Sequence, residues 1–520
     1  MTAGAVAAGS PLTVEAGLAA LRKGGNAVDA AVAASVMAGV AEPLLTGLGG
    51  AGMGIVRMDG EVRTLDLFSD VPGLGRPGGA RASLERVDVD FGPAVQTFHV
   101  GAGAAAVPGL PGGLELLHRT HGRVPMPDLL EPAARAAEAG VPVTRGFEQV
   151  ASLLWPILKR DPSVRALFER EGRSVREGDT FRNPELGGTI RRFAQHGAQL
   201  FQDGALGDAM LGALGPVGAL TRGDLTAWEP RFADPIRYRY RDATVWLPGP
   251  SSVGGLLVAQ ALRALEDHGP MPEPFGAGQV RFLAHALRRA DRTRGPRLHD
   301  HLHEPGFMAG FLAALAPEEE DEARAHGGRQ GRGEAPPREP GNTTHISVVD
   351  SDGNAVGLTH SLGETCGLMV PGTGLFLNNF LGESDVFPPD ADLRPGQRLM
   401  TMCCPTILEV GGNTYVMGSG GSSRIRSAVL HGVVYLTDHG LDAAQAVAAP
   451  RCHVEGGQLY AETADRPPGA LEALAAGNPG MRRFEGRNMF FGGLHMVGVG
   501  PAGFSGAGDA RRSGTFGVTD

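Results

Sequence analysis

The stretch from Thr343 to Ser361, TTHISVVDSDGNAVGLTHS, constrains the fold of this chain most strongly. Two runs rich in β-branched residues flank a turn, which predicts an antiparallel hairpin. Residues 351–353 suit a three-residue loop that ends in Gly353 with a positive φ. In that register Thr343 lies directly opposite Ser361, with the two Cβ atoms about 4.5–5.5 Å apart. A two-residue loop would put these hydroxyls on opposite faces of the sheet, and Gly353 favours the longer loop.

The residues before this hairpin differ in composition. Residues 317–340 are charged and rich in Gly and Pro, with almost no large apolar side chains. Such a segment cannot bury enough surface to become strongly ordered, so we predict a flexible stretch here. A linker between independent domains is normally followed by a turn or a helix cap, and here a strand with two hydroxyl residues follows instead.

The chemistry open to Thr343 depends on whether the chain is cut before it. As an internal residue it is a poor nucleophile with no base beside it, and strands favour threonine without any functional reason. A cut creates an α-amine with a pKa of roughly 7.7–8.0, neutral in about a tenth to a fifth of molecules at pH 7. That amine can serve as the general base for the hydroxyl of its own residue. Thr343 is therefore a candidate nucleophile only in a cleaved chain.

Bulk composition excludes several classes of protein. The chain has 520 residues, 42% of them apolar and 20% charged, which is typical of one large or two intertwined globular domains. The net charge of −10 argues against nucleic acid as a partner. The start has no basic n-region, and the longest apolar run, residues 30–41, is far short of the ~20 residues that span a bilayer. We therefore predict no membrane partner and a cytoplasmic location.

Cysteine usage agrees with a reducing compartment. The chain has four cysteines, two of them adjacent and none in a metal-type CxxC pair. We predict that all four are reduced and buried. They are Cys366, Cys403, Cys404 and Cys452.

Periodicity predicts an α+β protein. Helical spacing covers residues 11–21 and 25–41, and a hairpin that turns at residues 59–60 follows. Residues 108–315 are mainly helical, with one β-like interruption, IRYRYRDATVWLPGP. After residue 340 strands dominate, in THISVVD, NAVGLTH, GLFLNN, TILEV and NTYVMG, with helices expected at 426–438 and 441–449. This order predicts a helix-rich first part and a strand-rich second part.

Several segments together resemble the γ-glutamyltranspeptidase family of N-terminal-nucleophile (Ntn) hydrolases. In the first part these are LRKGGNAVDAAVAAS, LTGLGGAGMGIV, AAVPGLPGGLELLHRTHGRVPMPDLLEPAARAAEAG and LPGPSSVGGLLVAQAL. In the second part they are TTHISVVDSDGNAV, GTGLFLNN and MGSGGSSRIRSAVLHGVVYLTDHGLDAAQAVAAPRCH. The resemblance implies a four-layer αββα sandwich, made as one precursor and cut between Asn342 and Thr343. The large subunit, residues 1–342, and the small subunit, residues 343–520, would intertwine as one structural domain.

The resemblance also implies roles for individual residues, with no cofactor. Thr343 would attack first the carbonyl of Asn342 and then, with its freed amine as base, amide substrates through an acyl-threonine ester. Ser361 stands where the family has a hydroxyl bonded to the catalytic threonine. Gly421 and Ser422, in GSGGSSR, occupy the glycine pair whose N–H groups hold the oxyanion. One such donor typically lowers the barrier by about 2.7–4 kcal/mol, and serine at the second position keeps its N–H.

Positions expected to contact the substrate depart from the family's pattern. Phe68, in LDLFSD, stands where the γ-glutamyl enzymes have an arginine that binds the substrate α-carboxylate. Charge-assisted hydrogen bonds contribute roughly 1.5–3 kcal/mol each, so its loss costs about 10- to 100-fold in selectivity. Arg63, Arg398 and Arg424 are candidates to replace it. The other predicted substrate-binding positions that differ from the pattern are Gly363, Phe380, Glu383, Thr401 and Met402.

Two further motifs have simpler interpretations. GLGGAGMG contains G-x-G-x-x-G, but a strand follows it where a dinucleotide site needs a helix. HDHLHE, residues 299–304, has alternate spacing near prolines that is typical of a solvated loop, and we predict no metal site.

Three functions remain open from the sequence. The first is an autoprocessing γ-glutamyltransferase-like amidohydrolase that acts on glutathione-type substrates. The second is a cephalosporin-acylase-like hydrolase of another side-chain amide, with Phe68 and Phe380 lining a more apolar acyl pocket. The third is an uncleaved, non-catalytic binding protein with the same fold. In the first two, the partners are a small amide or peptide and the two subunits themselves, and a homodimer of subunit pairs is a further option.

Overall fold

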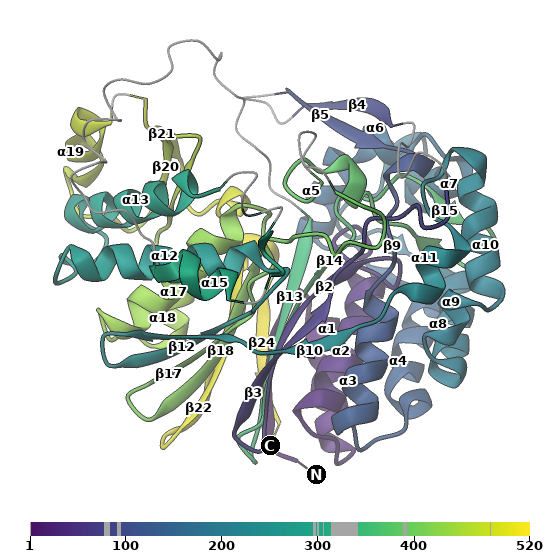
Figure 1. Cartoon of the computed structure of the whole chain (residues 1–520), viewed down its shortest axis with the longest axis horizontal. Coiled ribbons are helices and arrows are strands. Elements are labelled where there is room, and N and C mark those ends of the chain that lie inside the picture. Colours follow the sequence, from purple (N-terminus) through teal and green to yellow (C-terminus); the bar gives the residue numbers. More distant parts are fainter. Residues whose placement is uncertain are drawn as a thin grey trace.

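The computed structural model describes residues 2–76, 84–90, 95–294, 298, 301–304, 306–313, 342–387, 393–478 and 480–519. The segment predicted to be flexible, residues 317–340, lies outside the described residues. Two large antiparallel sheets pack face to face at the centre of the molecule (Figure 1).

The first sheet has seven strands drawn from both parts of the chain. Their order is β10 (Arg231–Ala233), β3 (Glu61–Leu67), β2 (Ala51–Met58), β14 (Ala355–Ser361), β13 (Thr343–Asp350), β1 (Gly4–Ala8) and β24 (Thr515–Val518). The two ends of the chain meet at one edge, where the backbone N–H of Thr519 donates to the Gly4 carbonyl at 2.9 Å. The N–H of Gly4 donates in turn to the Thr519 hydroxyl at 2.8 Å.

The second sheet has six strands and is likewise mixed in origin. Their order is β11 (Ile236–Tyr240), β12 (Ala243–Leu247), β17 (Thr406–Val410), β18 (Asn413–Gly420), β22 (Gly493–Gly500) and β23 (Gly503–Ala507). Alternate side chains of the two sheets meet in a shared apolar layer, because successive residues of a strand point to opposite faces. This layer includes Ala5, Ile55, Val349, Ile407, Val416 and Val497.

Helices pack on the outer face of each sheet (Figure 1). The first sheet is covered by α1 (Pro11–Arg22), α2 (Ala27–Ala41) and α3 (Leu110–His121), with α4 (Met126–Ala139) and α8 (Pro184–His196) beyond them. The second sheet is covered by α12 (Val253–Asp267), α17 (Arg424–Thr437) and α18 (Ala443–Ala448), with α13 (Ala277–Arg292) packed on α12. Every residue of α2 is buried, and a capping box between Asn26 and Asp29 starts that helix. The structure is therefore a mixed helix and sheet fold, as predicted.

Shorter elements complete the described part of the chain. The helices are α5 (Arg145–Leu153), α6 (Trp155–Leu158), α7 (Pro162–Phe168), α9 (Gln199–Gln202), α10 (Ala205–Leu214), α11 (Arg222–Ala227), α15 (Phe307–Ala313) and α19 (Ala470–Gly477). The strands are β4 (Glu85–Asp90), β5 (Val95–Val100), β6 (Val141–Pro142), β7 (Glu169–Arg170), β8 (Arg173–Ser174), β9 (Thr180–Phe181), β15 (Met369–Val370), β16 (Leu375–Phe376), β19 (Cys452–Glu455), β20 (Gln458–Glu462) and β21 (Arg482–Phe484).

The predicted hairpin and its register are confirmed. Thr343 is paired with Ser361 in the β13–β14 ladder. The loop closes through a hydrogen bond of 3.0 Å from the Asp350 N–H to the Asn354 carbonyl, and Gly353 has a φ of 81°. The hairpin predicted to turn at residues 59–60 is also present, between β2 and β3.

Strands from both parts of the chain contribute to each sheet. Three predictions about single elements need correction. GLFLNN contributes only the two-residue strand β16, since glycines with positive φ at 372 and 374 bend the chain before it. The helix expected at 426–438 begins two residues earlier, at Arg424, and the helix expected at 441–449 spans only Ala443–Ala448.

Two of the predictions drawn from composition are tested by the structure. All four cysteines are buried and free, as predicted. Within the described residues, no helix combines the length and apolarity needed to cross a bilayer. The cytoplasmic location stays a prediction.

Candidate functional site

The site lies at the end of the β13–β14 hairpin where the two predicted hydroxyls meet. The Ser361 hydroxyl donates a short hydrogen bond to the carbonyl of Asn342, the residue before Thr343. The same hydroxyl accepts from the Gly363 N–H at 2.8 Å. Asn342, Thr343 and Ser361 are all buried, and the Asn342 Oδ1 atom has no hydrogen-bond partner among the described residues. Ser361 therefore polarises the carbonyl of the peptide bond that precedes Thr343.

The end of β18 closes over this hairpin. A Cβ atom built on Gly420 would lie 2.0 Å from the Thr343 carbonyl oxygen, so only glycine allows the two backbones to approach this closely. Gly421 follows with a φ of 122° and Ser422 with a φ of 48°. Both values lie in the left-handed region that favours glycine, and Ser422 adopts it although it has a side chain.

A pocket of about 410 Å³ opens at this point. It brings together all but one of the site residues predicted from the sequence, and the exception, Gly421, precedes the lining residue Ser422. The lining residues are Phe68, Asn342, Thr343, Ser361, Gly363, Phe380, Glu383, Asp385, Val386, Thr401, Met402, Cys403, Ser422 and Ile425. We call this the catalytic pocket, and the chemical roles of its residues stay predictions.

One side of the catalytic pocket is apolar. The rings of Phe68 and Phe380 pack with their centroids 5.0 Å apart. Met402, Val386 and Ile425 extend this apolar lining. Phe68 is bound into its loop, because its N–H donates to Asp66 at 3.1 Å and its carbonyl accepts from Trp228 at 2.9 Å.

The lining of the catalytic pocket also includes carboxyl groups. Glu383 is half-buried, its buried Oε1 atom has no hydrogen-bond partner among the described residues, and desolvation raises its pKa well above the usual value. Burial also raises the pKa of the neighbouring Glu364 to about 7. Asp385 forms an ion pair with Arg294 at 3.0 Å and accepts a hydrogen bond from the Ser422 hydroxyl at 3.2 Å. No arginine or lysine is among the described residues that line the catalytic pocket.

The three arginines considered as replacements for the missing carboxylate ligand lie elsewhere. Arg398 is bound by Asp66 at 3.1 Å and Asp70 at 2.6 Å. Arg63 is half-exposed, 3.9 Å from the carboxylate of Asp234. Arg424 lies 3.8 Å from Glu455 and stacks over the ring of Phe490. None of the three lines the catalytic pocket, so its lining supports none of these candidates as the replacement.

Sequence reasoning missed four of the lining residues, namely Asp385, Val386, Cys403 and Ile425. Each lies within three residues of a predicted position, so chain proximity to Glu383, Met402 and Ser422 was the available signal. His345, on the same face as Thr343, is a structural residue. Its two ring nitrogens are held by Thr359 at 2.7 Å and Ser347 at 2.8 Å, and burial lowers its pKa.

Comparisons with known proteins show which family the chain resembles as a whole. A family model described as Gamma-glutamyltranspeptidase matches residues 13–518. An acylase ACY 1 proenzyme from Pseudomonas sp. (strain V22) is 31% identical over 526 residues, covering 98% of this chain and 93% of the relative. A glutathione hydrolase proenzyme from Escherichia coli (strain K12) is 30% identical over 478 residues, covering 86% and 80%. The crystal structure of cephalosporin acylase from Bacillus halodurans superposes with a TM-score of 0.80 at 25% identity, covering 99% of this chain and 96% of that chain. The chain belongs to the gamma-glutamyltranspeptidase family.

Proposed function

We propose that this protein is an autoprocessing amidase of the Ntn-hydrolase type, with a four-layer αββα sandwich and Thr343 as its nucleophile. The observation that carries the proposal is the hydroxyl of Ser361, which donates to the Asn342 carbonyl directly opposite Thr343. This bond draws electron density from the carbonyl carbon that Thr343 must attack. The Thr343 hydroxyl then attacks this carbon, and the peptide C–N bond breaks as the Thr343 nitrogen takes up a proton. Water hydrolyses the resulting ester between Asn342 and Thr343. The products are residues 1–342 and 343–520.

The mature enzyme repeats this chemistry on an amide substrate. The freed α-amine of Thr343 takes the proton from the hydroxyl, and the oxygen attacks the substrate carbonyl. In this proposal the backbone N–H groups of Gly421 and Ser422, which directly follow β18, receive the oxyanion. The leaving amine takes the proton, and water or a second amine then releases the acyl group from Thr343.

We propose further that the acyl group has no carboxylate at its far end. The catalytic pocket offers the Phe68–Phe380 pair and two carboxyl groups, Glu383 and Asp385, and its described lining contains no cation. A substrate carboxylate would be desolvated there without a partner, which is costly. The function is then an acylase of neutral or amine-bearing acyl groups.

A γ-glutamyl transferase or hydrolase is the second candidate. Glu383 favours it, because a carboxyl group in the acyl pocket can bind an α-ammonium group. The similarity to a glutathione hydrolase proenzyme supports the same candidate.

Maturation is tested on a denaturing gel of the purified protein. We expect two bands that together account for 54.0 kDa, with Thr343 at the new amino terminus. T343A should remain one band and T343S should mature. A single wild-type band together with no amide hydrolysis would identify the chain as a binding protein with this fold.

Four p-nitroanilides with the same five-carbon acyl chain test the substrate. They are the γ-glutamyl, glutaryl, 4-aminopentanoyl and pentanoyl compounds, which carry or lack an amine and a carboxylate in every combination. We expect removal of the carboxylate to raise kcat/KM about 10-fold or more, with or without the amine. Fastest turnover of the γ-glutamyl compound would favour the second candidate instead.

A further inference from the structure

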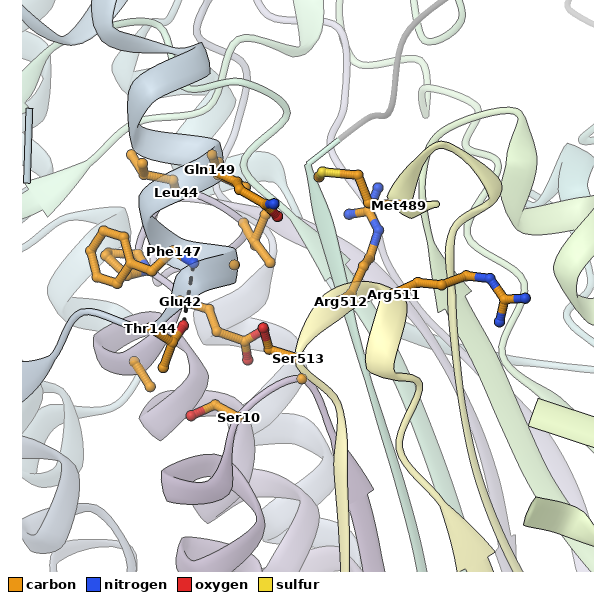
Figure 2. Close-up of a pocket in the computed structure, with 16 residues that line it drawn as sticks. Ser10, Glu42, Leu44, Thr144, Phe147, Gln149, Met489, Arg511, Arg512 and Ser513 are labelled. Carbon is orange, nitrogen blue, oxygen red and sulfur yellow. Dashed lines mark hydrogen bonds between the residues drawn. The ribbon is translucent and has the colours of Figure 1, made fainter. Parts of the chain in front are cut away.

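A second pocket, of about 510 Å³, has Glu42 in its lining (Figure 2). The catalytic pocket includes Ser361 at the end of β14, on one side of β13. The second pocket includes Gly9 and Ser513, beside the ends of β1 and β24 on the other side. We call it the Glu42 pocket, and its lining is Gly9, Ser10, Ala41, Glu42, Pro43, Leu44, Leu45, Thr144, Gly146, Phe147, Gln149, Val150, Met489, Arg511, Arg512 and Ser513.

Glu42 joins this pocket to β13. The hydroxyl of Thr344, the residue after the proposed nucleophile, donates to both carboxyl oxygens of Glu42, at 3.3 and 3.4 Å. Thr13 adds a contact of 3.5 Å. The carboxyl rests against the backbone of Gly9, where a Cβ atom would lie 2.1 Å from Oε1. Backbone packing and two hydroxyls therefore fix the position of the carboxyl group.

The first residues of β13 have no partner in β1, and the contact between Thr344 and Glu42 lies in this stretch. On one side β13 is paired with β14 along its whole length, from Thr343 to Val349. On the other side its register with β1 runs only from Asp350 to Ser347, so residues 343–346 lie beyond it. Thr344 is the residue of this stretch that bonds to Glu42.

Cleavage makes this contact more important. Once the bond before Thr343 is cut, β13 begins at its nucleophile, and chain termini are poorly ordered unless they are tied down. Successive residues of a strand face opposite ways, so Thr344 points to the helix-covered side while Thr343 faces Ser361. A bond that fixes Thr344 therefore fixes the direction of Thr343.

The charged groups around Glu42 are few. Burial raises its pKa to about 7, and the field of Arg512 acts in the opposite direction. Arg512 reaches the end of β18, where a Cβ atom on Gly421 would lie 3.5 Å from its Nη2 atom. Arg511 points away from the pocket (Figure 2) and pairs with Glu462 at 2.6 Å. Other ionisable groups on the surrounding elements have partners elsewhere: Glu15 with Arg22, Glu148 with the Glu177 N–H, and His360 with Thr46 and Ser35.

We propose that Glu42 is a positioning residue for the nucleophile, because its carboxyl holds the Thr344 hydroxyl and so fixes the amino end of β13. This inference rests on the proposed function. It assigns Glu42 no contact with substrate, so its loss should lower kcat and the rate of maturation while leaving KM nearly unchanged.

The test compares E42A, T344V and their double variant with the wild-type enzyme, using the best p-nitroanilide. Each single variant should lower kcat roughly 10-fold, the effect expected for a lost hydrogen bond to a charged group. The double variant should be no slower than either single variant, because both remove the same contact. T344S keeps the hydroxyl and should restore kcat. Q149A, at an exposed residue that lines the same pocket, is the control and should match the wild type.

Two further measurements separate positioning from a general loss of structure. In E42A, acetate entering through the Glu42 pocket should recover part of kcat. The maturation rate of the wild-type precursor should rise with pH around 7, where no α-amine exists yet at position 343, and E42Q should flatten this rise. If T344V fails to fold, G9A, which displaces the carboxyl without removing it, replaces it.

The outcomes are distinguishable. Single variants with kcat and maturation rates within twofold of the wild type would overturn this inference and leave the proposed function intact. A wild-type protein that neither matures nor hydrolyses any of the anilides would overturn the proposed function, and the inference with it.

Discussion

Ser361 holds two partners at once, the Asn342 carbonyl and the Gly363 N–H. Removing its hydroxyl in S361A leaves the carbonyl of the cleavable bond without its donor. We expect maturation to slow by about 10-fold or more, because one donor to a developing oxyanion is typically worth 10²–10³ in rate. A time course of precursor loss on denaturing gels measures this. S361T, which keeps a hydroxyl, is the matched control, and equal rates for S361A and wild type would contradict the role of Ser361.

Ser422 has a backbone conformation that suits glycine better than serine. Its φ is 48°, and its hydroxyl bonds to Asp385 at 3.2 Å. S422A and S422G both lose this bond, but only S422G relieves the strain of the left-handed conformation. We expect S422G to have a free energy of unfolding about 1 kcal/mol higher than S422A, measured by urea denaturation in the T343A background. Equal stability of the two variants would mean that the conformation carries no strain.

At the scale of elements, the contact between β18 and β13 depends on Gly420. G420A places a methyl group against the Thr343 carbonyl and must push the two strands apart. We expect loss of maturation and a free energy of unfolding lower by about 2 kcal/mol or more, since backbone atoms cannot move aside cheaply. G188A is the control: Gly188 lies exposed in α8 with open space around it, and alanine there should be neutral or stabilising.

The elements also show what the sequence could and could not predict. The β13–β14 hairpin and its register were predictable because the loop at Gly353 is local and sets the pairing by itself. The neighbour of β13 on the other side was not, because β1 pairs Gly4 with Asp350, which lies more than half of the chain away in the sequence. No local pattern specifies such a partner.

Some features of the candidate site were likewise predictable from local sequence, and others were not. Thr343, Ser361 and the residues near Glu383 were found through motifs with fixed spacing. The engagement of Arg398 with Asp66 and Asp70, which removes it from the catalytic pocket, arises from packing of distant segments. The same is true of Glu42, at the end of α2, which reaches Thr344 only through the fold.

At the scale of the whole molecule, buried ionisable groups set how stability depends on pH. Burial lowers the pKa of several imidazoles in the described part of the chain, five of which are fully buried, so the unfolded chain binds protons below pH 6.5 that the folded chain does not. Their contribution to stability is complete above pH 6.5 and declines as pH falls toward the folded pKa values. The five are His345, His360, His431, His453 and His495, with folded pKa values of about 3 for His360 and His431 and about 4 for His453 and His495.

Buried carboxyls act in the opposite direction. The pKa values of Glu42 and Glu364 are raised from 4.5 to about 7, and that of Asp70 from 3.8 to about 6, so stability increases as pH falls through this range. We expect the three carboxyls to offset part of the histidine loss between pH 6.5 and 4.5. Below pH 4.5 the histidine loss is unopposed by Glu42 and Glu364, and stability should fall steeply, by up to about 1.4 kcal/mol per histidine per pH unit. Urea midpoints of T343A from pH 7 to 3.5 measure this, and a uniform slope across the range would contradict it.

The two ends of the chain lie on neighbouring strands, joined by the hydrogen bonds between Gly4 and Thr519. This adjacency allows a circular permutation, because termini that lie close together tolerate being linked. A gene that starts at Thr343, runs to residue 519 and continues through a short glycine bridge into residues 2–342 would keep the strand order of both sheets. Once the initiator methionine is removed, such a chain has a free Thr343 amine without any internal cleavage. We expect it to hydrolyse the anilides as soon as it folds, with no precursor band on the gel.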